Sequence, residues 1–348
     1  MTIASEDIIS CRELLRGGSR TFFAASLVLP RRVSDPAIAL YAFCRLADDA
    51  VDLGSDGNAA VETMKHRLDR AYRGAPMPFA SDRAFADVVA TFSIPREIPE
   101  ALIDGLAWDA AGRRYETLED LYGYAARVAG TVGAMMTLVM GQRSPEIVAR
   151  ACDLGVAMQL TNIARDVGDD ARAGRLYLPL QWLREAGIDP DTWIANPVFN
   201  SAIAQIVQRL LDAADSLYSR ATLGIQNLPW TCRPGIYAAR ALYAEIGREV
   251  ERRNLDSISQ RAVVSLRRKL AVLSRTLALF ESGWKPARAL ESQIHATRFL
   301  IDAITSSPPR EPAPQPGKTS RSIEDRVVWV IDLFERLERR DQLQRSQF

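Results

Sequence analysis

The sequence contains very little histidine or cysteine, and this scarcity limits the chemistry that it can support. Only two histidines, His66 and His295, occur in 348 residues, so a Ser-His-Asp triad or a histidine-based metal site is poorly supplied. The four cysteines are scattered without a C-x-x-C pair, which favours reduced, mostly buried thiols in a cytoplasmic protein. If the protein is an enzyme, we therefore expect carboxylates and a metal ion to dominate its chemistry.

The chain also lacks an excess of either charge and a long apolar run. Its 44 Lys and Arg residues balance 43 Asp and Glu residues, for a formal net charge of +1, so no nucleic-acid partner is expected. The N-terminus has no basic region followed by an apolar stretch, which predicts no secretory signal. The longest apolar stretch, residues 128–141, is shorter than the roughly 20 residues that span a bilayer, and we expect a buried helix there.

The spacing of apolar residues predicts an all-α protein. Apolar residues recur at helical intervals through most of the chain, and no convincing period-two alternation is present. A hydrophobic fraction of 47% is enough for a sizeable core, and about ten helices without strands favour a bundled α-helical domain. The predicted helices span residues 6–16, 34–53, 59–73, 97–112, 117–140, 145–168, 199–222, 234–253, 262–281 and 286–304.

A proline-rich segment divides the chain near its end. Residues 306–320 read SSPPREPAPQPGKTS, which predicts a solvated linker between an all-helical catalytic domain at 1–305 and a tail at 321–348. The tail returns to helical periodicity, and we expect its helix to fold back onto the main domain. The alternative is an interfacial helix resting on a membrane, which the several acidic residues of the tail disfavour.

The first acidic motif is Asp48-Asp49-x-x-Asp52, within the segment YAFCRLADDAVD. At 3.6 residues per turn, Tyr41, Arg45, Asp48 and Asp52 share one stripe of a helix that is otherwise mostly apolar. Carboxylates so close together repel one another, and burying each without a counter-charge costs on the order of several kcal/mol. A shared Mg²⁺ would relieve this repulsion, because Mg²⁺ combines one or two carboxylates with phosphate oxygens and waters. A solvated helix face is the alternative.

The second acidic motif, in the segment MQLTNIARDVGDD, repeats this pattern independently. Gln159, Asn162, Asp166 and Asp170 form one polar stripe at steps of three and four, and the opposite face of the predicted helix is apolar. Amide and carboxylate oxygens suit a hard cation, Mg²⁺ or Mn²⁺, better than Zn²⁺. Arg165 lies beside the stripe, where it could contact a diphosphate.

The two motifs together favour metal-assisted ionisation of a diphosphate. Stripes that face one cavity could hold several Mg²⁺ ions, which would neutralise the diphosphate and draw it from an allylic carbon. The resulting cation needs a dry pocket, and the small residues at 128–137 would let a long chain approach, although such residues more often serve tight helix packing. A helical assembly protein whose acids are ordinary surface charges is the non-enzymatic alternative.

Six segments appear in order between about Gly17 and Leu270: GSRTFFAASLVLPRR, YAFCRLADDAVD, YAARVAGTVGAMM, MQLTNIARDVGDD, GRLYLP and YAEIGREVERRNLD. On these segments the chain resembles the squalene/phytoene synthase family. The resemblance implies an isoprenoid-synthase-type helical bundle around a central active-site cavity, and a Mg²⁺-dependent prenyltransferase. It also implies that two geranylgeranyl diphosphates condense head to head, through prephytoene diphosphate, to phytoene, with release of diphosphate, in carotenoid biosynthesis.

The resemblance assigns roles to individual positions. The implied metal ligands are Asp48, Asp52, Asn162, Asp166 and Asp170, and the four aspartates among them are the implied catalytic residues. The implied substrate contacts are Ser19, Arg20, Thr21, Tyr41, Arg45, Asp49, Gln159, Arg165, Tyr177 and Tyr243. No NADPH is expected, because only the related synthesis of squalene consumes it.

Two positions depart from the family pattern. Gly18 stands where relatives often have a histidine, and Ala126 stands where many have a tyrosine. A phenol near the substrate cation would therefore have to come from Tyr124, Tyr41 or Tyr243.

Three questions stay open at the level of sequence. Squalene or dehydrosqualene synthesis from two farnesyl diphosphates is the nearest alternative, and a head-to-tail prenyltransferase would need a second D-D-x-x-D motif. Peripheral contact with the inner face of a membrane is a conceivable route for product release. The oligomeric state is undetermined.

Overall fold

The computed structural model describes residues 3–18, 26, 28–53, 57–281 and 293–307, which contain helices and no strands. Side chains at a few helix ends, Asp52 among them, lie outside this description. The elements, in chain order, are α1 (Ser5–Gly18), α3 (Arg31–Leu53), α4 (Gly57–Tyr72), α5 (Ala80–Thr91), α6 (Glu97–Ala110), α7 (Leu118–Ala125), the π-helical turn η1 (Ala126–Gly130), α8 (Thr131–Val139), α9 (Pro145–Arg172), α10 (Leu180–Glu185), α11 (Pro190–Ala195), α12 (Ser201–Ile225), α13 (Arg233–Arg252), α14 (Leu266–Glu281), the 3₁₀ turn η2 (His295–Thr297) and α15 (Arg298–Ser306).

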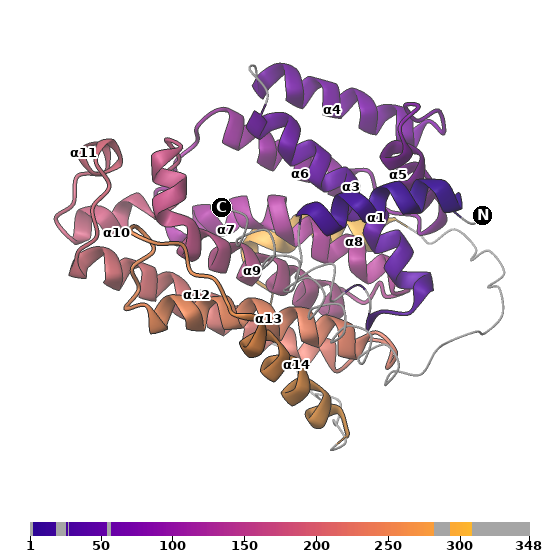
Figure 1. The fold of residues 1–348 in the computed structure, drawn as a ribbon. Coiled ribbons are helices and arrows are strands. Elements are labelled where there is room, and N and C mark those ends of the chain that lie inside the picture. The colour runs from indigo at the N-terminus through magenta and orange to yellow at the C-terminus, as the bar shows by residue number, and fades with distance from the viewer. Residues whose placement is uncertain (1–2, 19–25, 27, 54–56, 282–292, 308–348) are drawn as a thin grey trace, which may run out of the picture.

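Helix α9 lies at the centre of the fold and packs against α7, α8, η1, α12, α13 and α15 (Figure 1). Two glycines let η1 and α8 approach it closely. A Cβ atom at Gly155 would lie 2.3 Å from the carbonyl oxygen of Ala129, and one at Gly133 would lie 2.2 Å from that of Ala151. The small residues around position 130 therefore serve tight helix packing, the more common of the two explanations considered for them.

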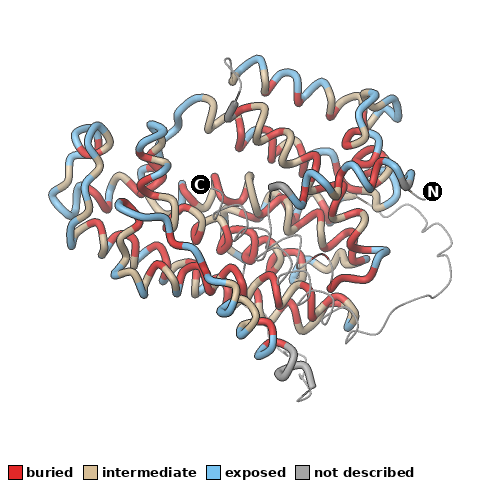
Figure 2. Tube along the Cα trace, in the orientation of Figure 1, coloured by how far each residue is buried: buried red, intermediate tan, exposed pale blue. Residues whose placement is uncertain are grey.

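The apolar core consists of two clusters of buried side chains. One is built mainly from α1, α3, α4, α5, α6 and α8, and the other mainly from α7, α9, α12 and α13. Figure 2 shows buried positions on the inward faces of these helices and exposed positions along their outer faces. Helix α8 packs against both α3 and α9, so it connects the two helices that carry the acidic motifs.

Three helices were not predicted: α5, α10 and α11. Helix α5 depends on contacts that are distant in sequence. Asp82 is fully buried and forms an ion pair with Arg67 of α4 at 2.5 Å, while Phe85 stacks on Phe43 of α3 with ring centroids 3.9 Å apart. A charged residue at a buried position interrupts the apolar periodicity by which α5 could have been predicted. Helices α10 and α11 have only six residues each, which is too short for a clear periodic pattern.

The predicted helix over 117–140 is present as a continuous helical stretch, and the π-helical turn η1 lies within it between α7 and α8. The predicted helix at 286–304 is described only from residue 293, where η2 leads into α15. Residues 308–348, with most of the predicted linker and the whole predicted tail, lie outside the described residues. No helix in the described part of the chain is both long enough and apolar enough to cross a bilayer.

Candidate active site

The first acidic motif lies on α3, on a partly open face of a well-buried helix. Phe43 and Ala47 are fully buried, whereas Tyr41, Arg45 and Asp48 are half-buried, as the predicted stripe requires. Burial raises the pKa of the Tyr41 phenol above its usual value. The positive charge of Arg45 opposes this shift but does not cancel it. The side chain of Asp52, the fourth member of the stripe, lies outside the described residues.

Arg45 neutralises part of this acidic motif. Its guanidinium lies 2.6 Å from the carboxylate of Asp49 and 3.3 Å from that of Asp48. The exposed fractions of the three side chains lie between 33% and 44%. The acids are therefore less buried than expected from the apolar character of the segment. This partial exposure places them where a soluble, charged ligand can reach them.

The second acidic motif lies in the C-terminal half of α9, on a face of that helix that stays partly exposed. Between residues 152 and 168 every side chain is buried except four, which are half-buried: Gln159, Asn162, Arg165 and Asp166. In the described part of the chain, the predicted polar stripe thus contributes three of the four side chains of this stretch that keep some exposure.

Two arginines hold the carboxylate of Asp166. Arg165 donates to both carboxylate oxygens at 2.7 and 2.5 Å, and Arg261 donates to the same oxygens at 2.7 and 3.2 Å. Burial alone would raise the pKa of Asp166, but the hydrogen bonds from the two guanidinium groups outweigh it, so the pKa lies below its usual value. Arg261 comes from the segment after α13, and the sequence patterns did not indicate it.

Asp170 lies in the opposite electrostatic environment. Burial and then the negative charge of Asp166 raise the pKa of Asp170 to about 7, with smaller contributions from Asp109 and Asp169 and an opposing one from Arg175. The end of the stripe therefore has an excess of negative charge that a bound cation would relieve.

A cluster of tyrosines around Asp109 adjoins the second motif. The hydroxyl groups of Tyr124 and Tyr177 each donate to Asp109 at 2.7 Å, one to each carboxylate oxygen. Tyr115 packs against both rings, with centroids 5.2 and 6.3 Å apart. Asp109 is on α6 and was not predicted as a site residue, because its contact with Tyr177 depends on the tertiary structure and not on spacing in the sequence.

The remaining predicted site residues fall into two groups. Tyr177 and Tyr243 are buried, with Tyr243 on α13, the helix that packs against α9. Ser19, Arg20 and Thr21 lie outside the described residues, so their predicted contact with the diphosphate stays a prediction.

The donor set suits metal ions that are shared with a diphosphate. Among the described side chains, no three His, Cys, Asp or Glu residues form a ready-made metal site. Each stripe instead offers one or two carboxylates, and Mg²⁺ completes such a set with phosphate oxygens and waters. Arg45, Arg165 and Arg261 place positive charge beside these carboxylates, so the site combines acids that could hold a cation with guanidinium groups that could bind a diphosphate.

Known proteins with similar sequences or folds agree with this description. The model of the family described as squalene/phytoene synthase matches residues 15–268. A phytoene synthase of Rhodobacter capsulatus is 54% identical over 310 residues, which cover 86% of this chain and 91% of that protein. A phytoene synthase of Cereibacter sphaeroides is 48% identical over 323 residues, covering 88% of this chain and 90% of that protein. A crystal structure of a dehydrosqualene synthase matches with a TM-score of 0.73 at 28% identity, covering 80% of this chain and 98% of that one.

An all-helical fold with acidic stripes on α3 and α9 defines a prenyltransferase-type enzyme of the isoprenoid-synthase class. Within that class, the chain belongs to the squalene/phytoene synthase family. The predicted family and fold class are thereby confirmed.

Proposed function

We infer that the protein has phytoene synthase activity and joins two geranylgeranyl diphosphates head to head. The reaction passes through prephytoene diphosphate and releases diphosphate. The observation that carries this inference is the 54% identity to a phytoene synthase over 91% of its length. The similar solved structures of a dehydrosqualene synthase and a squalene synthase are only 28% and 26% identical, so a farnesyl diphosphate substrate is the weaker alternative.

We propose that the two stripes hold Mg²⁺, or Mn²⁺ in its place, around the substrate diphosphate. The ligands would be Asp48 and Asp52 on α3 and Asn162, Asp166 and Asp170 on α9. The bound metal supplies positive charge that makes diphosphate a better leaving group. Arg45, at the edge of the first stripe, is placed to donate charge-assisted hydrogen bonds to the same group.

Asp166 would have to exchange partners when substrate binds. Its oxygens accept four hydrogen bonds from Arg165 and Arg261. An incoming diphosphate offers these guanidinium groups other acceptors of higher charge. We propose that both arginines turn from Asp166 to the substrate, which frees the carboxylate and brings two positive charges to the leaving group.

The tyrosine cluster would act after the diphosphate has left. Because Tyr124 and Tyr177 both donate to Asp109, the two phenol oxygens and the carboxylate are fixed in position relative to one another. A positioned carboxylate with its phenol partners, close to the reacting carbons, would stabilise a developing carbocation. Tyr124 would thus provide the phenol that Ala126 lacks.

The released hydrocarbon is apolar, and we propose that the enzyme works in the cytoplasm, in peripheral contact with the inner face of a membrane. The direct test of the proposed activity is incubation of the purified protein with geranylgeranyl diphosphate and Mg²⁺, without NADPH. Phytoene in the extracted hydrocarbon supports the proposal. Turnover that occurs only with NADPH would contradict it.

A further inference from the structure

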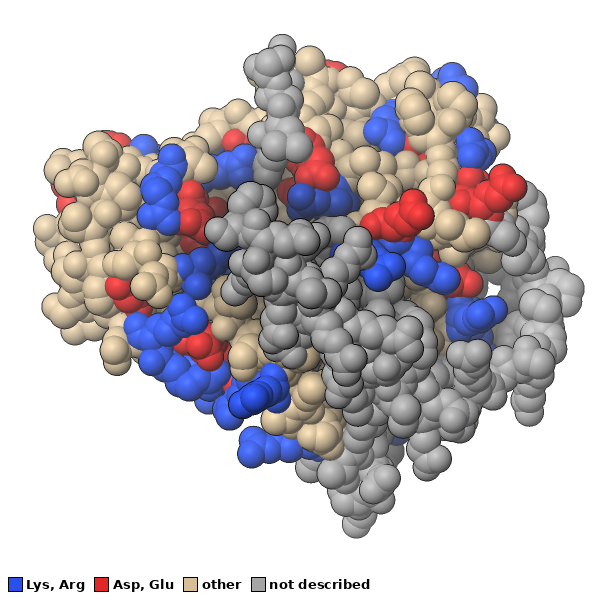
Figure 3. Space-filling view, in the orientation of Figure 1, with Lys and Arg blue, Asp and Glu red and all other residues tan. Residues whose placement is uncertain are grey.

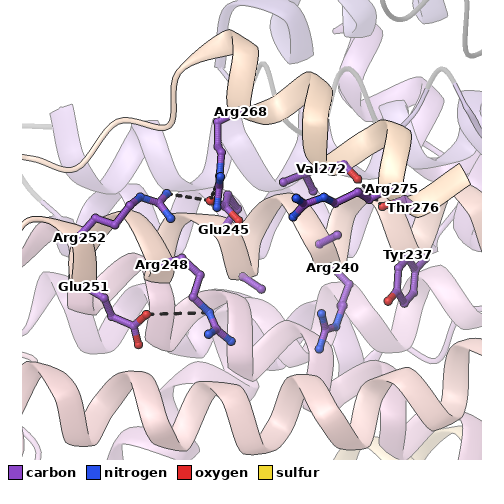
Figure 4. A pocket seen from close by; sticks show the side chains of 12 residues that line it. Tyr237, Arg240, Glu245, Arg248, Glu251, Arg252, Arg268, Val272, Arg275 and Thr276 are labelled. Atoms are coloured by element: carbon purple, nitrogen blue, oxygen red, sulfur yellow. Dashed lines mark hydrogen bonds and ion pairs between the residues drawn. The ribbon is translucent and has the colours of Figure 1, made fainter. Parts of the chain in front are cut away.

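A groove between α13 and α14 lies outside all the residues assigned to the substrate. It has a volume of about 620 Å³, and Figure 4 shows side chains from both helices along it. Its charged lining residues are Arg240, Arg248, Arg252, Arg268, Arg275, Glu245 and Glu251. The whole chain has a formal net charge of only +1, so this excess of arginine is local.

One part of the groove is an ion-pair network that joins the two helices. Arg252 of α13 and Arg268 of α14 both donate to the same oxygen of Glu245, each at 2.7 Å. Arg248 pairs with Asp215 of α12 at 2.9 Å. These arginines already have acidic partners, so they account for the packing of α14 on α13 without any ligand.

The other two arginines have no acidic partner among the described residues. The guanidinium of Arg240 lies over the rings of Tyr218 and Tyr237, 5.5 and 5.8 Å from their centroids, and its Nε atom is buried without an acceptor. Arg275 is exposed on α14 and reaches the groove from the other helix. A buried donor without an acceptor is costly, and guanidinium groups that lack an acidic partner among the described residues favour an anion in the groove.

The start of α14 adds a second, independent observation. Its first turn contains Arg267, Arg268 and Lys269 and no acidic residue. Positive side chains are unfavourable at the N-terminus of a helix, where the helix dipole is already positive and acids are preferred. Glu245 offsets the charge of Arg268, and the other two basic residues add positive charge at this end of α14. Figure 3 shows Lys and Arg side chains gathered near α13 and the start of α14.

We propose that this groove, here called the α13–α14 groove, binds a phosphate-bearing anion, which Arg240 and Arg275 hold. Guanidinium groups match the geometry and charge of phosphate oxygens better than other cationic side chains do. Two sources share this chemistry: the headgroup of an anionic phospholipid at a membrane surface, and free diphosphate in solution. The site is separate from the acidic stripes, so its occupancy does not depend on the proposed function.

The test compares the double variant Arg240→Gln/Arg275→Gln with the control Arg184→Gln/Arg209→Gln. The control removes the same charge from two half-exposed arginines outside the groove. One arm measures co-sedimentation with vesicles of phosphatidylglycerol or of phosphatidylcholine, and the other measures titration with inorganic diphosphate, both in EDTA. Near an anionic surface each arginine contributes about fivefold in affinity, so the groove variant should bind about thirtyfold more weakly.

The outcomes of the two arms are distinct. A loss confined to phosphatidylglycerol vesicles identifies a lipid headgroup as the ligand, and a loss in the diphosphate titration identifies free diphosphate. Equal binding by the groove variant and the control in both arms overturns the proposal. Because Arg240 packs on Tyr218, Arg275→Gln alone is measured as well: it changes only an exposed side chain, and about fivefold weaker binding is expected.

Discussion

Arg261 donates two hydrogen bonds to the carboxylate of Asp166, at 2.7 and 3.2 Å, although the two residues are 95 positions apart in the chain. This contact connects the segment after α13 to the second acidic stripe. It also places a protein cation where the proposed metal would bind. The guanidinium of Arg261 and the metal would therefore compete for the carboxylate of Asp166.

Arg261→Gln is expected to destabilise the protein more in EDTA than in saturating Mg²⁺, with no diphosphate in either sample. Without metal, Asp166 loses a partly exposed ion pair worth about 1 kcal/mol. With Mg²⁺ bound, a cation other than Arg261 satisfies the carboxylate and the difference should largely vanish. Thermal unfolding of wild type, Arg261→Gln and Arg209→Gln under both conditions measures the effect. The same destabilisation in both conditions would show that Arg261 has a purely structural role.

Asp48→Ala and Asp166→Ala should fold and yet lose turnover by orders of magnitude, because each removes a proposed metal ligand. Asp169→Asn is the matched control. It lies on α9 beside Asp166, but its side chain is 52% exposed, pairs with Arg172 at 2.6 Å and is 3.8 Å from Arg261, farther than Asp166 is. Turnover close to wild type is expected for the control. Full activity of Asp48→Ala or Asp166→Ala in saturating Mg²⁺ would refute the metal assignment.

Two tyrosines of one cluster should respond in opposite ways to loss of the hydroxyl group. Tyr177→Phe takes a hydrogen bond from the half-buried Asp109 and should cost about 1–3 kcal/mol in the free energy of unfolding, with reduced turnover. Tyr115→Phe should be neutral or stabilising, because the Tyr115 hydroxyl is buried without a hydrogen-bond partner in the described structure. Chemical denaturation compares the two variants. Equal loss in the free energy of unfolding for the two variants would contradict the different hydrogen bonding assigned to the two hydroxyl groups.

Two helical glycines should differ just as clearly. Gly155→Ala places a methyl group 2.3 Å from the Ala129 carbonyl oxygen, which forces η1 away from α9 and should cost about 3 kcal/mol or more. Gly123→Ala in α7 meets no atom within 4 Å and should stabilise the protein by about 0.5–1 kcal/mol through helix propensity. Thermal melts of the two variants check both signs. A Gly155→Ala protein as stable as wild type would contradict the close packing of these elements.

Much of the site was predictable because its residues are local. Asn162 and Asp166 are four positions apart on one helix, and helical spacing alone puts them on one stripe. The burial of α9 confirms that this stripe is the accessible face. Periodicity likewise predicted most of the long helices and the all-α class.

The rest depends on contacts that local patterns do not encode. Asp109 carries no motif, and it joins the site only because Tyr177, 68 positions later, points a hydroxyl group at it. Arg261 reaches Asp166 across a similarly long separation. The turn η1 was missed because a π-helical turn has the same local composition as the α-helix that was predicted over 117–140. Helix α5 was missed because Asp82 is buried through Arg67 of another helix.

The most direct test of the central claim is one competition assay. The purified protein receives equal amounts of geranylgeranyl and farnesyl diphosphate with Mg²⁺, in parallel samples with and without EDTA and NADPH, and the extracted hydrocarbons are resolved by mass. We predict phytoene as the main product, independent of NADPH and abolished by EDTA. A C30 hydrocarbon as the main product, or turnover that persists in EDTA, would contradict the account.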